Sequence, residues 1–117
     1  MEIVRSNSNA RMSQMVVYNG VVYLAGQVDE TSQIGRSVLE QTRNVLAQID
    51  GYLAQAGTDK TRLLTATIYL SDMSQFAQMN QAWDAWVSPQ GLPTRATVQA
   101  KLAGAEFDVE IVVTAAV

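Results

Sequence analysis

The sequence predicts an α+β domain in which one mixed sheet carries two helices on one of its faces. Three features predict it: short β-branched runs that alternate in polarity, two longer segments with apolar residues every three or four positions, and turn residues between them. The predicted order is β-β-α-β-α-β-β, and we expect residues 1–117 to form a single domain. Two helices on one face leave the other face uncovered, so we expect the chain to self-associate.

The first predicted hairpin joins residues 13–18 to residues 21–25 through Asn19-Gly20. Asn-Gly between two apolar runs is the strongest short hairpin signal, because both turn residues must accept positive φ. Residues 1–11 are polar and are predicted to form a loop or an edge strand. Residues 28–35 form a polar connector; it contains Asp29 and Glu30 but no third spaced ligand, so we expect no metal there.

The first helix is predicted to begin at Ser37, which forms a capping-box pattern with Glu40, and to end before Gly57. One face of it is apolar, and we expect that face to cover the sheet. The strand predicted at residues 62–70 is apolar on both sides, so we expect it to be central or buried on both faces.

The second helix is predicted to begin after Ser71 or Asp72 and to run to about Trp86. Its apolar positions follow helical spacing: Met73, Phe76, Met79, Trp83 and Val87. Asn80 lies on this same face. Because a buried amide needs partners, Asn80 either bonds to a loop backbone or helps to shape a pocket.

Composition excludes several classes of chemistry. The chain has no Cys and no His, which removes thiolate nucleophiles, imidazole bases and the usual zinc sites, so acid–base work falls to carboxyl groups. The net charge is −3 and the positive residues are scattered, which argues against a nucleic-acid partner. No apolar run approaches the ~18 residues of a membrane span and no signal-peptide pattern is present, so we expect a cytoplasmic protein without a membrane partner.

A second hairpin is predicted from two alternating runs, residues 95–100 and 109–114, with Gly104 between them. A reversal centred between Leu102 and Ala105 would place Arg95 and Thr97 on the same face as Glu110. On this pairing alone the group is either a surface ion pair, worth about 0–1 kcal/mol, or a site.

The residues around this group resemble the signature of the Rid family, the reactive intermediate deaminases, also called the YjgF family. The matching parts are PTRATV at residues 93–98, Lys101-Leu102-Ala103, and Val109-Glu110-Ile111. The segment from Leu24 to Gln27 resembles the part of the family where Ser-Gly-Gln usually stands. The resemblance extends from about Ser13 to Val117. It implies the chorismate-mutase-like YjgF fold and a homotrimer with ligand clefts between neighbouring copies.

The resemblance implies hydrolysis of reactive enamines or imines, such as 2-aminoacrylate, to 2-keto acids and ammonia. This is the activity of a 2-iminobutanoate/2-iminopropanoate deaminase, and it needs no cofactor and no metal. Arg95 would hold the substrate carboxylate, and Glu110 would position and deprotonate the attacking water. The Gly26 carbonyl would accept from the substrate nitrogen, Thr97 would contribute its amide or hydroxyl, and Asn80 would lie near the ligand-binding arginine.

Three positions depart from the family pattern. Met12 stands at about the place where a Tyr is often found, Ala25 where a Ser precedes Gly-Gln, and Thr97 where a Cys stands two residues after the arginine. The first two changes remove polar contacts from the rim of the implied pocket and leave the substrate range open.

Two other functions stay open. The chain is alternatively a non-catalytic trimer that binds 2-keto acids at Arg95 as a sensor or regulator. The ribonuclease activity attached to some relatives is disfavoured by the absence of His, the lack of a basic cluster and a pI of about 4.7.

Overall fold

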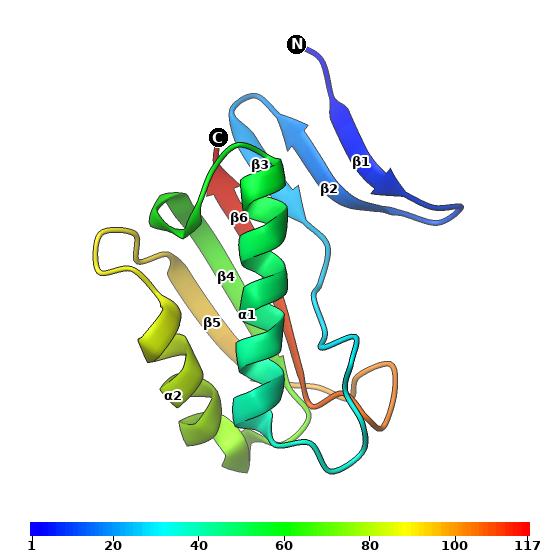
Figure 1. The fold of residues 1–117 in the computed structure, drawn as a ribbon, viewed down its shortest axis with the longest axis vertical. Coiled ribbons are helices and arrows are strands. Elements are labelled where there is room, and N and C mark those ends of the chain that lie inside the picture. Colours follow the sequence, from blue (N-terminus) through cyan, green and yellow to red (C-terminus); the bar gives the residue numbers. More distant parts are fainter.

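The computed structural model describes residues 1–117 and contains one six-stranded mixed sheet with both helices on one face (Figure 1). The strand order across the sheet is β1-β2-β3-β6-β4-β5. The strands are β1 (Val4–Ser8), β2 (Ser13–Tyr18), β3 (Val21–Leu24), β4 (Leu63–Leu70), β5 (Thr94–Gln99) and β6 (Val109–Ala116); the helices are α1 (Val38–Gln55) and α2 (Phe76–Trp86). The predicted α+β class and the placement of both helices on one face are confirmed.

The first hairpin forms as predicted. Asn19 and Gly20 adopt positive φ values of 51° and 78°, and the register pairs Tyr18 with Val21 across the turn. The polar segment before it forms an edge strand, β1, paired antiparallel with β2. Of the two alternatives left open for residues 1–11, the edge strand is therefore correct.

The helix ends also follow their sequence signals. The Ser37 hydroxyl accepts a hydrogen bond from the Glu40 N–H at 3.1 Å, and Gly57 follows the helix with a φ of 82°. Asp72 caps a short 3-10 turn, Met73–Gln75, which leads directly into α2. The residues of α1 that face the sheet are buried: Val38, Gln41, Thr42, Val45, Leu46, Ile49 and Leu53.

The second predicted hairpin is wrong. β5 pairs parallel with β4 at the edge of the sheet, whereas β6 lies between β3 and β4 and is antiparallel to both. β6 takes the central position because every second residue, Val109, Ile111, Val113 and Ala115, is fully buried against the helices. β5 carries more polar residues and suits an edge. Residues 100–108 form the connection past the end of β4 (Figure 1).

The strand predicted to be central is central, since β4 lies between β6 and β5. Within one chain it is covered on the helix side only, and Leu64 remains 42% exposed. On the sheet face away from the helices, Tyr18, Tyr23 and Val98 are between 41% and 46% exposed. The sheet therefore presents an open face, as two helices on one side require. Neither helix is both long and apolar enough to cross a membrane.

Candidate functional site

The register through β4 places Arg95 and Glu110 on opposite faces of the sheet. Arg95 lies beside Ala66 and Glu110 lies beside Tyr69. Residues three apart in one strand point to opposite faces, so the two side chains do the same. The prediction that Arg95, Thr97 and Glu110 share a face is therefore wrong, because it assumed that β5 and β6 were neighbours. Thr97 stays on the face of Arg95, two residues further along β5.

The chain thus carries two separate groups. We call the residues around the guanidinium the Arg95 cluster: Arg95, Thr97, Asn80, Phe76 and Trp83. We call the residues beside the carboxyl group the Glu110 cluster: Glu110, Gly26, Ala25 and Gln27.

The Arg95 cluster is assembled by α2. The Asn80 Oδ1 atom accepts a hydrogen bond from Arg95 Nη1 at 2.8 Å, so Asn80 contacts the arginine and not a loop backbone. The guanidinium carbon lies 5.7 Å from the ring centroid of Phe76 and 5.4 Å from that of Trp83. These three helix residues are spaced four and three apart, which places them on one face of α2.

The guanidinium is held without being neutralised. Both salt bridges of the chain involve Arg36, and neither involves Arg95. Aromatic faces and a neutral amide attract a cation but leave its charge in place. Since a guanidinium has five N–H donors in a planar fork, Arg95 retains the capacity to bind a carboxylate through two hydrogen bonds.

The hydroxyl and the backbone amide of Thr97, the two groups predicted to contact a ligand, have different surroundings. Its hydroxyl oxygen is buried and has no hydrogen-bond partner within the chain. The Ala100 N–H donates to the Leu70 carbonyl at 2.9 Å, so the alternate residues Arg95, Thr97 and Gln99 direct their N–H groups away from β4. Because β5 is the last strand of the sheet, the amide of Thr97 faces the free edge.

The Glu110 cluster is built where the chain leaves β3. The backbone N–H of Gln27 donates to the Ile111 carbonyl at 2.9 Å, and the Ile111 N–H donates back at 3.0 Å. This bridge brings Gly26 against Glu110: a Cβ atom on Gly26 would meet the Glu110 carboxyl oxygen and would lie 2.9 Å from the carboxyl carbon. Any residue with a Cβ at position 26 would therefore push the Glu110 carboxyl group out of its present position, and glycine does not.

The connector that follows is fixed by a buried acid. Asp29 is 0% exposed and accepts hydrogen bonds from Thr31, Asn44 and Arg36. Burial alone would raise the pKa of Asp29, but the hydrogen bonds from Asn44, Thr31 and Arg36 outweigh it and hold the pKa below its usual value. No group of three or more His, Cys, Asp or Glu residues is arranged to hold a metal ion.

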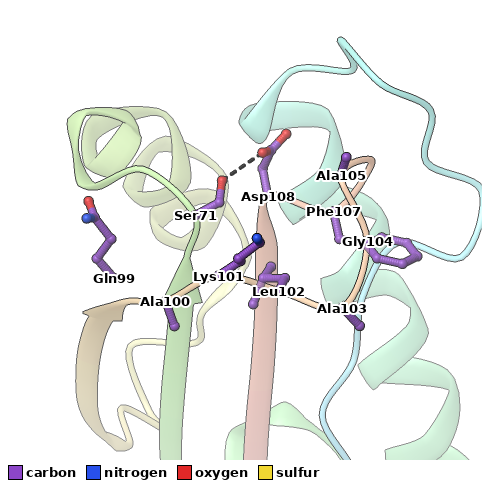
Figure 2. Close-up of a pocket in the computed structure, with 10 residues that line it drawn as sticks. All are labelled: Ser71, Gln99, Ala100, Lys101, Leu102, Ala103, Gly104, Ala105, Phe107 and Asp108. Atoms are coloured by element: carbon purple, nitrogen blue, oxygen red, sulfur yellow. Dashed lines mark hydrogen bonds between the residues drawn. The ribbon is translucent and has the colours of Figure 1, made fainter.

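The largest cavity of the chain, about 510 Å³, lies beside the loop between β5 and β6 (Figure 2). Lys101 and Leu102 of that loop, Phe107 and Asp108 surround it, and the Ser71 hydroxyl donates to Asp108 at 2.7 Å. Neither Arg95 nor Glu110 lines this cavity or any of the four smaller ones. The two clusters therefore lie on surfaces of the chain and not in a pocket of their own.

Sequence reasoning assigned Phe76 and Trp83 to a helix face and missed their contact with Arg95. The signal was present in their helical spacing with Asn80. It also overlooked the buried side chain of Gln27, which gives no periodic signal. Of the positions that depart from the family pattern, Met12 is 43% exposed just before β2, and Ala25 is half-buried next to Gly26.

Comparison with known proteins identifies the class. Residues 3–117 match the family model described as Endoribonuclease L-PSP. The chain is 45% identical over 115 residues to a RutC family protein of Haemophilus ducreyi, covering 98% of this chain and 97% of that protein. It is 44% identical over 117 residues to the RutC family protein YoaB of Escherichia coli K12, covering 100% of both.

Solved structures of similar sequence belong to the YjgF and Rid families. A YjgF family member from Neisseria meningitidis is 46% identical with a TM-score of 0.94, covering 99% of this chain and 95% of that one. A Rid family protein from Yersinia pestis is 30% identical with a TM-score of 0.85, covering 94% and 90%. The chain belongs to the YjgF/Rid family, so the resemblance read from residues 93–98 and 109–111 is confirmed.

Proposed function

We propose that the chain is a cytoplasmic homotrimeric deaminase that hydrolyses small carboxylate-bearing enamines or imines, of the 2-aminoacrylate type, to 2-keto acids and ammonia. Family membership supports the reaction class. The observation that carries the proposal is the state of Arg95: a guanidinium held by an amide and two aromatic rings, with no acidic partner. Such a group is suited to a substrate that brings its own carboxylate.

The proposed site is shared between two copies of the chain. Arg95 and Glu110 project from opposite faces of one sheet, so a single chain does not bring them together. A cyclic trimer joins two different surfaces of neighbouring copies, which allows the Arg95 cluster of one to meet the Glu110 cluster of the next. The free edge of β5 and the exposed apolar residues of the open face support this association.

The proposed chemistry uses one cation and one carboxyl group. Arg95 binds the substrate carboxylate and fixes the C=N carbon. Glu110 takes a proton from water as the oxygen bonds to that carbon, and the C=N electrons move to nitrogen, which is protonated. The hydroxyl proton of the carbinolamine then passes through the Glu110 carboxyl group to the amino nitrogen, the C–N bond breaks as the C=O bond forms, and ammonia leaves. The Gly26 carbonyl accepts from the substrate nitrogen, and the Thr97 amide lies at the same free edge as Arg95.

A non-catalytic function is the second candidate, and one observation favours it. The Arg95 cluster offers its guanidinium without any residue of the opposite face, whereas the carboxyl group proposed for turnover lies on that other face. A 2-keto acid sensor would use the first cluster alone. An RNA substrate is not supported, because eight cationic residues stand against eleven acidic ones and the cations are scattered along the sequence.

The test is a coupled assay in which an amino-acid oxidase generates imines from a panel of amino acids, and 2-keto acid release is followed. We expect Glu110→Gln to lose roughly 10²–10⁴-fold in kcat, the usual contribution of a general base. We expect Arg95→Ala to abolish saturable binding of the carboxylate. Arg43→Ala, an exposed arginine of α1, is the matched control.

The outcomes separate the candidates. Acceleration by the wild type that is lost in both site variants supports the deaminase. Binding of pyruvate at Arg95 without acceleration of any imine supports the sensor. A wild-type rate in Arg95→Ala contradicts the site.

A further inference from the structure

We propose that Gln27 is a positioning residue of this site: its buried amide and its backbone fix two successive peptide planes, so that the Gly26 carbonyl faces outward beside Glu110. The inference rests on the proposed function for its effect on turnover. Its structural part is measured independently of turnover.

The Gln27 side chain is buried and fully bonded. It is 3% exposed. Its Nε2 group donates to the Ala25 carbonyl and to Gln14 Oε1, both at 3.1 Å, and its Oε1 atom accepts from Gln48 Nε2 at 3.4 Å. One amide thus ties together β2, the residues after β3 and helix α1. This arrangement needs two donors and one acceptor at the end of one side chain, which Gln supplies and Met or Glu does not.

The backbone of Gln27 sets the first peptide plane. All peptide bonds are trans, so the C=O of each residue points opposite to the next N–H. The Gln27 N–H points at the Ile111 carbonyl. The Gly26 carbonyl therefore points away from β6.

The side chain of Gln27 sets the second plane. It holds the Ala25 carbonyl, so the Gly26 N–H points away from the Gln27 amide. Gly26 is exposed, and its N–H and C=O are absent from the hydrogen bonds within the chain. Two polar groups that are rigidly aimed but unbonded are what a ligand-facing backbone requires.

Gln27 also links Gly26 to Glu110. The bridge between Gln27 and Ile111 holds Gly26 next to the Glu110 carboxyl group, so closely that a Cβ on Gly26 would displace the carboxyl group. A shift of residues 25–27 would move the carbonyl and release the carboxyl group together. The two groups that the proposed reaction uses on this face therefore depend on one residue: the Gln27 backbone aims the carbonyl, and its buried side chain anchors this segment to β2 and α1.

The experiment compares Gln27→Met, which keeps the length and removes the hydrogen bonds, with Gln27→Glu and the wild type. Gln55→Met is the matched control, because Gln55 is an exposed α1 residue whose side chain bonds only to Asn7. Selective ¹⁵N-glycine labelling gives seven backbone signals. We expect the order parameter of Gly26 to fall from roughly 0.85 to below 0.6 in Gln27→Met, with the other glycines unchanged.

Turnover provides the second readout. We expect kcat of Gln27→Met to fall about tenfold while the Kd for pyruvate changes less than about twofold, because Arg95 lies on the other face. In Gln27→Glu the protonated carboxyl can donate to the Ala25 carbonyl. Its kcat relative to wild type should therefore rise as the pH is lowered from about 8 to 6, whereas that of Gln27→Met should stay constant.

An unchanged Gly26 order parameter in Gln27→Met overturns the inference, and so does an unchanged kcat with a mobile Gly26. If Gln27→Met does not fold, the same two measurements on Gln27→Glu, the Gly26 order parameter and the pH profile of kcat, decide whether Gln27 positions Gly26. If the wild type hydrolyses no imine, the proposed function fails, and the glycine signal alone decides whether Gln27 holds Gly26.

Discussion

The two clusters are built by different means. The Arg95 cluster lies on an edge strand and is held by side chains of α2, with Asn80 at 2.8 Å and two aromatic rings within 6 Å. The Glu110 cluster lies on a central strand and is held by backbone hydrogen bonds and the buried amide of Gln27. One offers a fixed positive charge, and the other a carboxyl group beside a free carbonyl. The fold therefore supports the cation and the carboxyl group separately, so we expect variants to damage the proposed binding or the proposed proton transfer one at a time.

The largest effect is expected from Gly26→Ala, which attacks the Glu110 cluster alone. The new Cβ would overlap the Glu110 carboxyl group and displace it. We expect kcat to fall about hundredfold, the scale of a misplaced general base, while pyruvate binding at Arg95 is retained. Gly51→Ala is the control, because its Cβ would meet nothing within 4 Å in the middle of α1. Equal losses of kcat and pyruvate affinity would contradict the separation of the two clusters.

A smaller effect is expected from Trp83→Leu, which weakens the Arg95 cluster alone. The indole face lies 5.4 Å from the guanidinium, and a partly desolvated cation–π contact contributes about 0.5–2 kcal/mol. We expect the Kd for pyruvate to rise about tenfold by calorimetry, with kcat at saturation nearly unchanged. Trp83→Phe keeps an aromatic face and should bind within about twofold of wild type. If both variants bind pyruvate like the wild type, the ring does not hold Arg95.

The smallest effect on the site is expected from Asp29→Asn, which loosens the connector next to the Glu110 cluster. Asn44, Thr31 and Arg36 lose a charged acceptor, so the free energy of unfolding should fall by about 1–3 kcal/mol at pH 7. Its exposed neighbour Glu30 provides the control variant, Glu30→Gln.

The contribution of Asp29 to the free energy of unfolding is expected to fall as the pH falls. Its pKa in the folded chain lies below the unfolded value of about 3.9, so its stabilisation is present above that value and is lost as the pH falls through the folded pKa. The unfolding free energies of wild type and Asp29→Asn, measured in urea, should therefore differ at pH 7, and the difference should shrink progressively as the pH falls below about 3.9. A constant difference at all pH values would show that the carboxylate charge is not what stabilises the connector.

Local signals in the sequence predicted local structure correctly. Asn19-Gly20, Ser37 with Glu40, Gly57 and Asp72 each act on neighbouring backbone, and each formed the expected turn or helix end. The partner of β5 was predicted wrongly because strand pairing is decided by burial across the whole sheet, which alternation within β5 does not report.

The wrong pairing of β5 with β6 also made the predicted arrangement of the site residues wrong. The residues Arg95 and Glu110 came from the family resemblance, but their common face came from the assumed hairpin. Their placement on opposite faces means that one chain does not bring them together, which agrees with the clefts between copies that the resemblance implies. Gln27 escaped notice because a single polar residue at the end of a strand carries no pattern that separates a buried amide from an exposed one.

The most direct test of this account is complementation between Arg95→Ala and Glu110→Gln. The two variants would be co-expressed with different tags, mixed oligomers isolated, and imine hydrolysis compared with each variant alone and with wild type. In an isolated mixed cyclic trimer, which holds two copies of one variant and one of the other, a site that takes Arg95 from one copy and Glu110 from the next is intact at about one of the three interfaces. We expect recovery to roughly a third of wild-type activity. Mixed oligomers no more active than the separate variants would contradict it, because Arg95 and Glu110 would then have to act within the same chain.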